Sequence, residues 1–470
     1  MTNNYRIEHD LLGEREIPEN VYWGIHTLRT QENFPISGVS VSLYPNLIKA
    51  LALVKKSAAT ANQELELLEP EKAAAIVQAC DDIINGQLHD QFVLDVIQGG
   101  AGTSTNMAAN EIIANRGLEL LGHPKGQYQF LHPVQDVNRS QSTNDVYPTA
   151  IKLGLSFAIV DLLAAMQTLQ AAFEAKVVEF SDILKIGRTQ LQDAVPMTVG
   201  QEFSTYAVML AEDRLRLMEA AKLLLEINLG ASAIGTGINT DPAYSKLACQ
   251  RLAEFSALDI IPAENLIEAT QDPGSFVQLS GVLKRVAIKL SKVCNDLRLL
   301  SSGPQAGFNE INLPARAAGS SIMPGKVNPI IPDVVNQVAF EVIGNDMTIS
   351  MAAEGGQLQL NAFEPIIAHS LFKSINHLTS ACQTLSVNCV SGITVNRERL
   401  SQLVNRSITL ITALNPFIGY ENTSKIAKEA LKLNKSVVDL VIEHKLLTKD
   451  ELDEILQPKN LPHPRKLFKK

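Results

Sequence analysis

Apolar side chains recur at helical spacing through the middle of this chain. From Ile159 to Val177 they lie mostly three and four residues apart. Further stretches of this kind cover 203–224, 276–300, 334–351 and 366–385. Several approach or exceed about 20 residues, whereas the mean globular helix has about 11–12. Because the apolar positions are wider than one stripe, the pattern predicts a bundle of long helices whose sides other subunits partly cover.

The pattern changes on either side of this middle part. The first portion mixes short helical patterns with turn clusters, the last shortens into smaller helices, and strand signals are almost absent. At 470 residues the chain exceeds the usual size of a single core. We therefore expect an all-α protein with three domains. They are an N-terminal mainly helical domain (1–140), a central long-helix bundle with a mobile loop at 319–329 (141–392), and a small helical C-terminal domain (393–470).

Composition narrows the class of protein. Hydrophobic residues make up 46% of the chain and charged residues 19%, which is typical of a soluble globular enzyme and excludes disorder. The net charge of −9 argues against a nucleic-acid partner. We interpret the single basic cluster as a solvated terminus; it consists of Arg465, Lys466, Lys469 and Lys470.

Cysteine usage and the N-terminus bear on compartment. The five cysteines form no CxxC pair, so we expect small buried hydrophobes rather than disulfides or a structural zinc site. The sequence begins without an apolar signal region, and no uninterrupted apolar run reaches about 18 residues. These features predict a cytoplasmic protein without a membrane partner.

Four polar, mostly Gly-containing segments interrupt the helical patterns, and each precedes a helical run. They cover 99–106, 138–145, 187–193 and 319–329. The last three contain a basic residue, namely Arg139, Arg188 and Lys326. A helix N-terminus offers unpaired N–H groups and the positive end of the dipole, which suits anions. Simple helix capping accounts for any one hydroxyl, but four such segments favour a site for an anionic substrate.

These segments lack the motifs of several common chemistries. Segment 319–329 has the wrong glycine spacing for a phosphate-binding loop, and Val327 stands where Ser or Thr would bind magnesium. No dinucleotide fingerprint, HExxH motif or Gly-x-Ser-x-Gly motif is present in the sequence. None of the nine histidines lies in a segment, so proton transfer there falls to Ser, Lys, Tyr or Asp.

The fourth segment carries a family resemblance. GSSIMPGKVNP from Gly319 closely resembles the signature loop of the aspartase/fumarase superfamily, and the likeness extends from Arg6 to His463. Three stretches are most similar to the aspartate ammonia-lyase branch. They are LKIGRTQLQDAVPMTVGQEF from Leu184, NLGASAIGTGINT from Asn228 and KVNPIIPDVVNQVAFEVIGND from Lys326.

The resemblance implies an activity and an assembly. The activity is reversible elimination of ammonia from L-aspartate to give fumarate. The assembly is a homotetramer whose long helices form one central bundle, each active site drawing residues from three subunits. No prosthetic cofactor and no metal ligand are implied, and the sequence leaves open whether a divalent cation activates the enzyme.

The resemblance also assigns roles to individual residues. Removing a proton from Cβ builds charge on the neighbouring carboxylate as an aci-carboxylate, which needs preorganised donors. These are Thr103, Ser142, Thr143 and Ser321; Lys326 and Asn328 hold the α-carboxylate, and Asn144, Thr189 and Gln190 accept from the ammonium group. Ser320 is the base, acting as an alkoxide that neighbouring N–H groups and cationic charge must stabilise. Gly319 and Gly325 are the expected hinges of its loop.

Departures from the family pattern leave alternatives. Gln190 replaces a frequent His, which favours an amine substrate, whereas Gln305 replaces a common Arg and Trp23 a frequent Tyr. The runner-up function is a class II-type fumarase that acts on L-malate. Lyases of argininosuccinate or adenylosuccinate, and a catalytically silent structural homologue, are further alternatives.

Overall fold

The protein is described by a computed structural model that covers residues 4–457 and 460–462. Most of the chain is helical, which confirms the predicted fold class. Contacts group the residues into two compact units. Unit 1 comprises Met1–Leu163, Leu215–Arg285 and Phe340–Leu378, and unit 2 comprises Ala164–Arg214, Val286–Ala339 and Thr379–Lys470. The three consecutive domains expected from the sequence divide the chain differently and stay a prediction.

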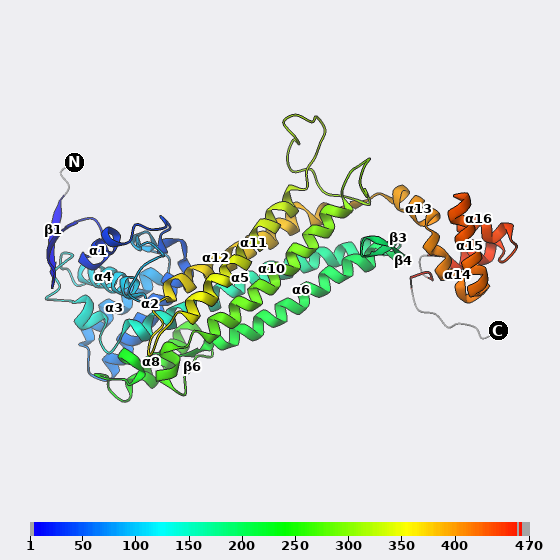
Figure 1. The fold of residues 1–470 in the computed structure, drawn as a ribbon. Helices are drawn as coiled ribbons and strands as arrows, with labels where there is room; N and C mark the ends of the chain where they lie inside the picture. The colour runs from blue at the N-terminus through cyan, green and yellow to red at the C-terminus, as the bar shows by residue number, and fades with distance from the viewer. Residues whose placement is uncertain (1–3, 458–459, 463–470) are drawn as a thin grey trace. The chain divides into compact units, whose positions relative to one another are not determined.

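All five predicted long helices are present (Figure 1). Each of them belongs partly to unit 1 and partly to unit 2. They are α5 (Thr143–Glu179), α6 (Val199–Lys222), α10 (Gly274–Leu300), α11 (Ile330–Glu354) and α12 (Glu364–Asn388). In unit 1, Asp346 of α11 accepts hydrogen bonds from Ser280 and Lys284 of α10. In unit 2, Asn336 of α11 donates to Ser291 of α10. The α10–α11 pair is therefore fastened by polar contacts within both units.

Shorter helices complete the two units. Those of unit 1 are α1 (Ile25–Asn33), α2 (Pro45–Glu64), α3 (Pro70–Ile84), α4 (Thr103–Leu120), α7 (Ser232–Gly235), α8 (Tyr244–Ser256) and α9 (Leu266–Gln271). Those of unit 2 are α13 (Arg397–Arg406), α14 (Ile411–Ile418), α15 (Tyr420–Leu433), α16 (Val437–Glu443) and α17 (Lys449–Ile455).

The sequence pattern predicts almost no strands, and this prediction is wrong. Three antiparallel pairs and one parallel pair occur in the described residues. They are β1 (Tyr5–Asp10) with β2 (Gly13–Pro18), β3 (Leu184–Thr189) with β4 (Gln192–Thr198), parallel β5 (Glu226–Ile227) with β6 (Ile261–Pro262), and β7 (Ile311–Asn312) with β8 (Thr394–Val395).

Buried charge hides the two longer hairpins from a hydrophobic pattern. In β1 the buried positions are Arg6 and Glu8, which pair at 2.8 Å, whereas Ile7 is exposed. In β3 a bulge between Ile186 and Arg188 breaks the alternation of faces. Period-two alternation of apolar residues is the signal by which a strand is recognised, and neither strand has it.

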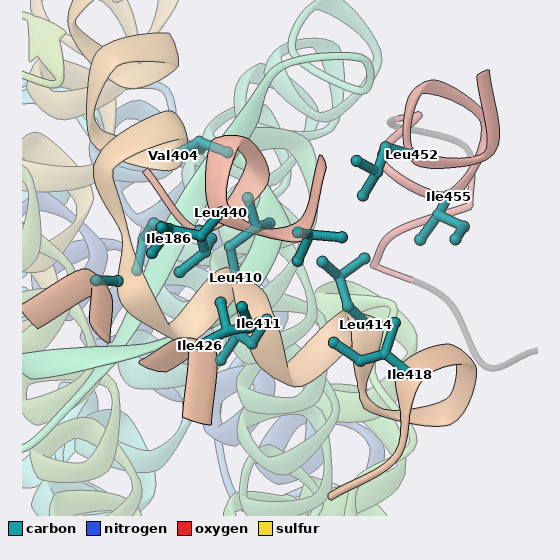
Figure 2. Close-up of a cluster of buried hydrophobic side chains, with 13 residues drawn as sticks. Ile186, Val404, Leu410, Ile411, Leu414, Ile418, Ile426, Leu440, Leu452 and Ile455 are labelled. Atoms are coloured by element: carbon teal, nitrogen blue, oxygen red, sulfur yellow. The ribbon is translucent and has the colours of Figure 1, made fainter. Parts of the chain in front are cut away.

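The C-terminal helices share a compact apolar core in unit 2. Figure 2 shows side chains of α13 to α17 that form this cluster, among them Val404, Ile411, Leu440 and Leu452. Ile186 of β3 belongs to the same cluster, so the β3–β4 hairpin is anchored on it. The basic cluster at 465–470 lies outside the described residues.

Helix α5 is long and apolar enough to span a membrane by length and composition alone. Lys152 and Asp161 interrupt its apolar residues, so no uninterrupted apolar run marks it in the sequence. Of its most apolar window, 72% is buried inside the protein, as in the core helix of a soluble protein. All five cysteines are buried, as predicted.

A buried carboxyl in unit 1 gives the protein's stability a pH dependence. Burial raises the pKa of Glu364, the first residue of α12, to about 8, against an ordinary value of 4.5, and Lys152 opposes this only in part. Its Oε2 has no hydrogen-bond partner among the described residues. Between these two values the folded protein keeps a proton that the unfolded chain has released, so the free energy of unfolding falls as pH rises through this window.

Glu364→Gln is expected to remove this dependence, because an amide resembles the protonated carboxyl and does not ionise. Thermal unfolding of both proteins between pH 5 and pH 8 measures it. The Tm of the variant minus that of the wild type should increase by a few degrees as the pH rises from 5 to 8. Parallel Tm curves for the two proteins would contradict this assignment.

Candidate active site

Four of the predicted substrate-binding residues lie at two helix N-termini in unit 1. Thr103 is the first residue of α4, while Ser142, Thr143 and Asn144 stand at the start of α5. Asn106, one turn into α4, donates from Nδ2 to Thr143 Oγ1 at 3.0 Å and so ties the two helix starts together. Side-chain hydroxyls therefore gather where the helix dipoles favour an anion.

A buried lysine that was not predicted from the sequence supports the loop before α5. Lys55 of α2 is fully buried, and its Nζ donates to Asn138 Oδ1 and Gln141 Oε1, both at 2.9 Å. Asn106 and Asn110 donate to the same Asn138 oxygen at 3.2 and 3.1 Å. Burial lowers the pKa of Lys55 to about 7. A lysine inside an apolar helical stretch was the signal that could have marked it.

The side-chain amide of Asn144 is held in one orientation. Its Nδ2 donates to the carbonyl oxygen of Ala233 at 2.6 Å, which leaves Oδ1 as the free acceptor. Ala233 has φ 61° and ψ −86°, a strained backbone conformation for a residue with a Cβ. The carboxylate of Asp145 accepts hydrogen bonds from the N–H groups of Ser142 at 3.0 Å and Gly230 at 2.8 Å, and so holds the segment that contains Ala233 against the start of α5.

Burial raises the pKa of Asp145 to about 6, and the hydrogen bonds from the backbone oppose that rise. Its carboxylate accepts from both sides of the site, the start of α5 and the segment that contains Ala233. The residue thus connects the two elements that orient Asn144.

The third polar segment forms a hairpin tip, which corrects the expectation that it directly precedes a helix. Thr189 pairs with Gln192, and the two residues between them adopt positive φ angles, 53° for Gln190 and 62° for Leu191. This is the backbone of a two-residue hairpin turn that usually takes Asn or Gly. Thr189 and Gln190 are exposed in unit 2. Strain at bulky residues of this kind is typical of functional sites.

The fourth segment is a closed turn on the long connection between α10 and α11, which Figure 1 shows without helix. Ser320 N–H donates to Lys326 O at 3.1 Å, and Lys326 N–H donates to Met323 O at 3.2 Å. The Oγ of Ser320 accepts the N–H groups of Ile322 and Met323, both at 3.3 Å. Donors of this kind stabilise negative charge on the oxygen.

Two further site residues line a cleft of about 770 Å³ in unit 2. Lys326 and Asn328 line it together with residues 301–304. Arg298 also lines the cleft and pairs with Asp333 at 2.8 Å. Ser321 is exposed on the closed turn. The ten predicted residues thus fall into two groups, four in unit 1 and six in unit 2.

The remaining predictions from the sequence concern Trp23, Gln305 and metal ligands. Trp23 is buried, and its carbonyl oxygen accepts from Arg6 Nη2 at 2.6 Å. Nothing in the structure explains Gln305. Within residues 4–457 and 460–462, no group of three or more His, Cys, Asp or Glu side chains is arranged to hold a metal ion.

Comparison with known families places the chain. The lyase family matches residues 13–344, and the family of fumarase C C-termini matches residues 410–463. The chain belongs to the lyase family. The predicted resemblance to the aspartase/fumarase superfamily is confirmed.

Members of the lyase family with full-length similarity include two aspartate ammonia-lyases. That of Pseudomonas aeruginosa is 60% identical over 461 residues, which cover 98% of this chain and 97% of the relative. That of Escherichia coli K12 is 54% identical over 465 residues, or 99% of this chain and 97% of the relative.

Solved structures of lyase-family proteins have the same fold. A "fumarate lyase:delta crystallin" from Brucella melitensis, bound to cobalt, superposes with a TM-score of 0.96 at 54% identity, over 98% of this chain and all of that one. A class II fumarase from Schistosoma mansoni gives a TM-score of 0.92 at 35% identity over the same shares. The aspartase/fumarase-type fold expected from the resemblance is thereby confirmed.

Proposed function

We propose that this protein is an aspartate ammonia-lyase, a carbon–nitrogen lyase that converts L-aspartate reversibly to fumarate and ammonia. The observation that carries the proposal is 54–60% identity to aspartate ammonia-lyases over nearly the whole chain. The structure of the site gives physical reasons for the residue types. The protein is expected to be cytoplasmic, with no nucleic-acid or membrane partner.

The unit 1 group suits the carboxylate that takes up negative charge. When a proton leaves Cβ, the charge delocalises into the neighbouring carboxylate, and the transition state is stabilised by donors already in place. Thr103, Ser142 and Thr143 supply hydroxyls at two helix N-termini, and Ser321 is the fourth donor of this proposal. Lys326 and Asn328 are the partners proposed for the α-carboxylate.

Ser320 is the proposed base. A serine hydroxyl removes a proton from carbon only if its alkoxide is stabilised. The N–H groups of Ile322 and Met323 both point at Oγ, which supports this role. In the elimination the Ser320 oxygen takes the Cβ proton, the electron pair of that C–H bond forms the carbon–carbon double bond, and the amine leaves with the electrons of the C–N bond.

The ammonium group needs acceptors, because it can only donate hydrogen bonds. Asn144 fits this role, since its Nδ2 is already engaged by Ala233 and its Oδ1 is left to accept. Thr189 and Gln190 are the other proposed acceptors, at the exposed hairpin tip. A hydroxyl substrate places no such demand on the orientation of Asn144.

We also propose the homotetramer, with each active site shared by three subunits. Support comes from apolar side chains exposed on one face of α11 in unit 1. Phe340, Ile343, Met347 and Met351 are 61%, 37%, 63% and 68% exposed and recur at three- and four-residue spacing. An apolar stripe of this kind on a soluble protein marks a contact surface. Sedimentation of the purified protein measures the assembly.

The function is tested by following the absorbance of fumarate with L-aspartate and, in parallel, with L-malate. Fumarate from aspartate alone, with an equal amount of ammonia, is the expected result. Turnover of malate alone would move the protein to the fumarases, a candidate that the similarity to a class II fumarase favours. No turnover of either substrate would favour the catalytically silent homologue.

A further inference from the structure

The hairpin tip that carries Thr189 and Gln190 needs an external support. Gln190 and Leu191 both adopt positive φ angles, which strain a residue that carries a Cβ, and such backbone persists only where its surroundings fix it. The tip itself is exposed, so the support must come from the strands below it. On one side Ile186 packs into the apolar cluster of the C-terminal helices (Figure 2).

A cluster of four charges, two of them buried and two partly buried, provides further support within unit 2. Lys185 Nζ lies 2.7 Å from Glu202 Oε2 and 2.8 Å from Glu310 Oε2. Arg188 Nη2 lies 2.6 Å from Glu310 Oε1, and its guanidinium stacks 4.2 Å from the ring centroid of Phe308. Each oxygen of Glu310 therefore holds a different cation of β3, and the cluster is electrically balanced.

Glu310 is itself fixed by its backbone. It is 1% exposed, its N–H donates to Leu300 O at 2.9 Å, and its carbonyl oxygen accepts from Asn396 N–H at 2.9 Å. It directly precedes β7, from which the chain runs on to Gly319 and Ser320. The segment 310–319, which leads to Ser320, is called the stem of the Ser320 loop. The side chain of Glu310 thus joins this stem to β3, the strand that ends in Thr189.

We propose that Glu310 is a positioning residue that sets the hairpin tip and the stem of the Ser320 loop in register with each other. It acts through Arg188 and Lys185 and touches no reacting atom. The inference rests on the proposed function for the roles of Ser320, Thr189 and Gln190. The arrangement itself rests on the contacts of the charge cluster. Glu310→Gln keeps the shape of the side chain but removes its charge.

The test combines amide hydrogen exchange with steady-state kinetics on the full-length protein. Glu310→Gln should speed exchange several-fold at 189–192 and at 313–323, and nowhere else in unit 2. It should lower kcat/KM for aspartate about 10-fold, mainly in kcat, because Ser320 acts in the transition state. Glu310→Asp, which keeps the charge, should recover part of both. Glu219→Gln, in the exposed pair of Arg216 and Glu219, is the matched control and should change neither.

Arg188→Lys separates the effect on the hairpin tip from the effect on the stem of the Ser320 loop. It also provides a test if Glu310→Gln does not fold. The lysine lacks the planar guanidinium of Arg188 and its stacking on Phe308. Amide hydrogen exchange should therefore rise at 189–192 and stay unchanged at 313–323. Wild-type exchange at both segments in Glu310→Gln would overturn the proposal, as would a rise spread evenly over unit 2. If Glu310→Gln does not fold, wild-type exchange at 189–192 in Arg188→Lys would overturn it. A wild type that releases no fumarate from aspartate would refute the proposed function, while the exchange comparison would still decide the role of Glu310.

Discussion

Ser320→Ala is expected to lower kcat for aspartate on the order of 10³–10⁴-fold while leaving KM within about threefold. The variant lacks the oxygen that takes the Cβ proton, and general bases of this kind contribute factors of about 10²–10⁴. The groups proposed to bind the two carboxylates and the ammonium remain, so ground-state binding is kept. Fumarate formation measured from micromolar to millimolar aspartate separates the two constants.

The fold of the Ser320→Ala variant should match the wild type. Among residues 4–457 and 460–462, the hydrogen bonds to Ser320 Oγ come only from Ile322 and Met323 of its own turn, so the substitution removes no hydrogen bond to a helix there. Ser401→Ala, on the exposed face of α13, is the matched control and should turn over at the wild-type rate. Near-normal kcat in Ser320→Ala would refute the assigned base and leave the family assignment untouched.

Gly319→Ala is expected to cost about 100-fold in kcat, because it opens the turn that presents Ser320. Gly319 has φ +95°, and a Cβ there would collide with the carbonyl oxygen of Lys326, which accepts from Ser320 N–H. The turn must then shift, and a displacement of about 1 Å at a catalytic group costs on the order of 10²-fold. Steady-state rates with saturating aspartate measure the effect.

Gly325→Ala provides a close control for the same loop. Gly325 has a similar backbone, φ +81°, but a Cβ there would meet no atom within 4 Å. Both variants share the strain of a positive φ, roughly 1–2 kcal/mol, and differ in the collision alone. We expect Gly325→Ala to lose less than about 10-fold in kcat and both variants to keep their Tm within about 2 °C. Equal losses in the two would show that strain, not the closed turn, limits the rate.

Much of the candidate site was predicted from local sequence because its residues lie in short polar segments between apolar helices. Thr103 and Thr143 stand at helix starts as expected, and the closed turn at 319–326 holds the predicted base and a predicted cation. What the pattern missed is the support behind these residues. Lys55 and Glu310 are buried charged side chains whose partners lie far away in the chain. The apolar stretch around Lys55 could have marked that lysine as buried, but no local spacing identifies the partners of either residue.

The sequence by itself determined the long helices, since a helix buries a stripe whose spacing is written into adjacent residues. It also determined the family and the positions where chemistry was to be expected. The tertiary structure alone decided that segment 187–193 is a hairpin tip, because β3 buries Lys185 against carboxylates rather than an apolar face. It alone decided which way Asn144 points, because the carbonyl of Ala233 reaches it from another segment. Buried polar groups must find partners, and which partners they find depends on how distant segments meet in the fold.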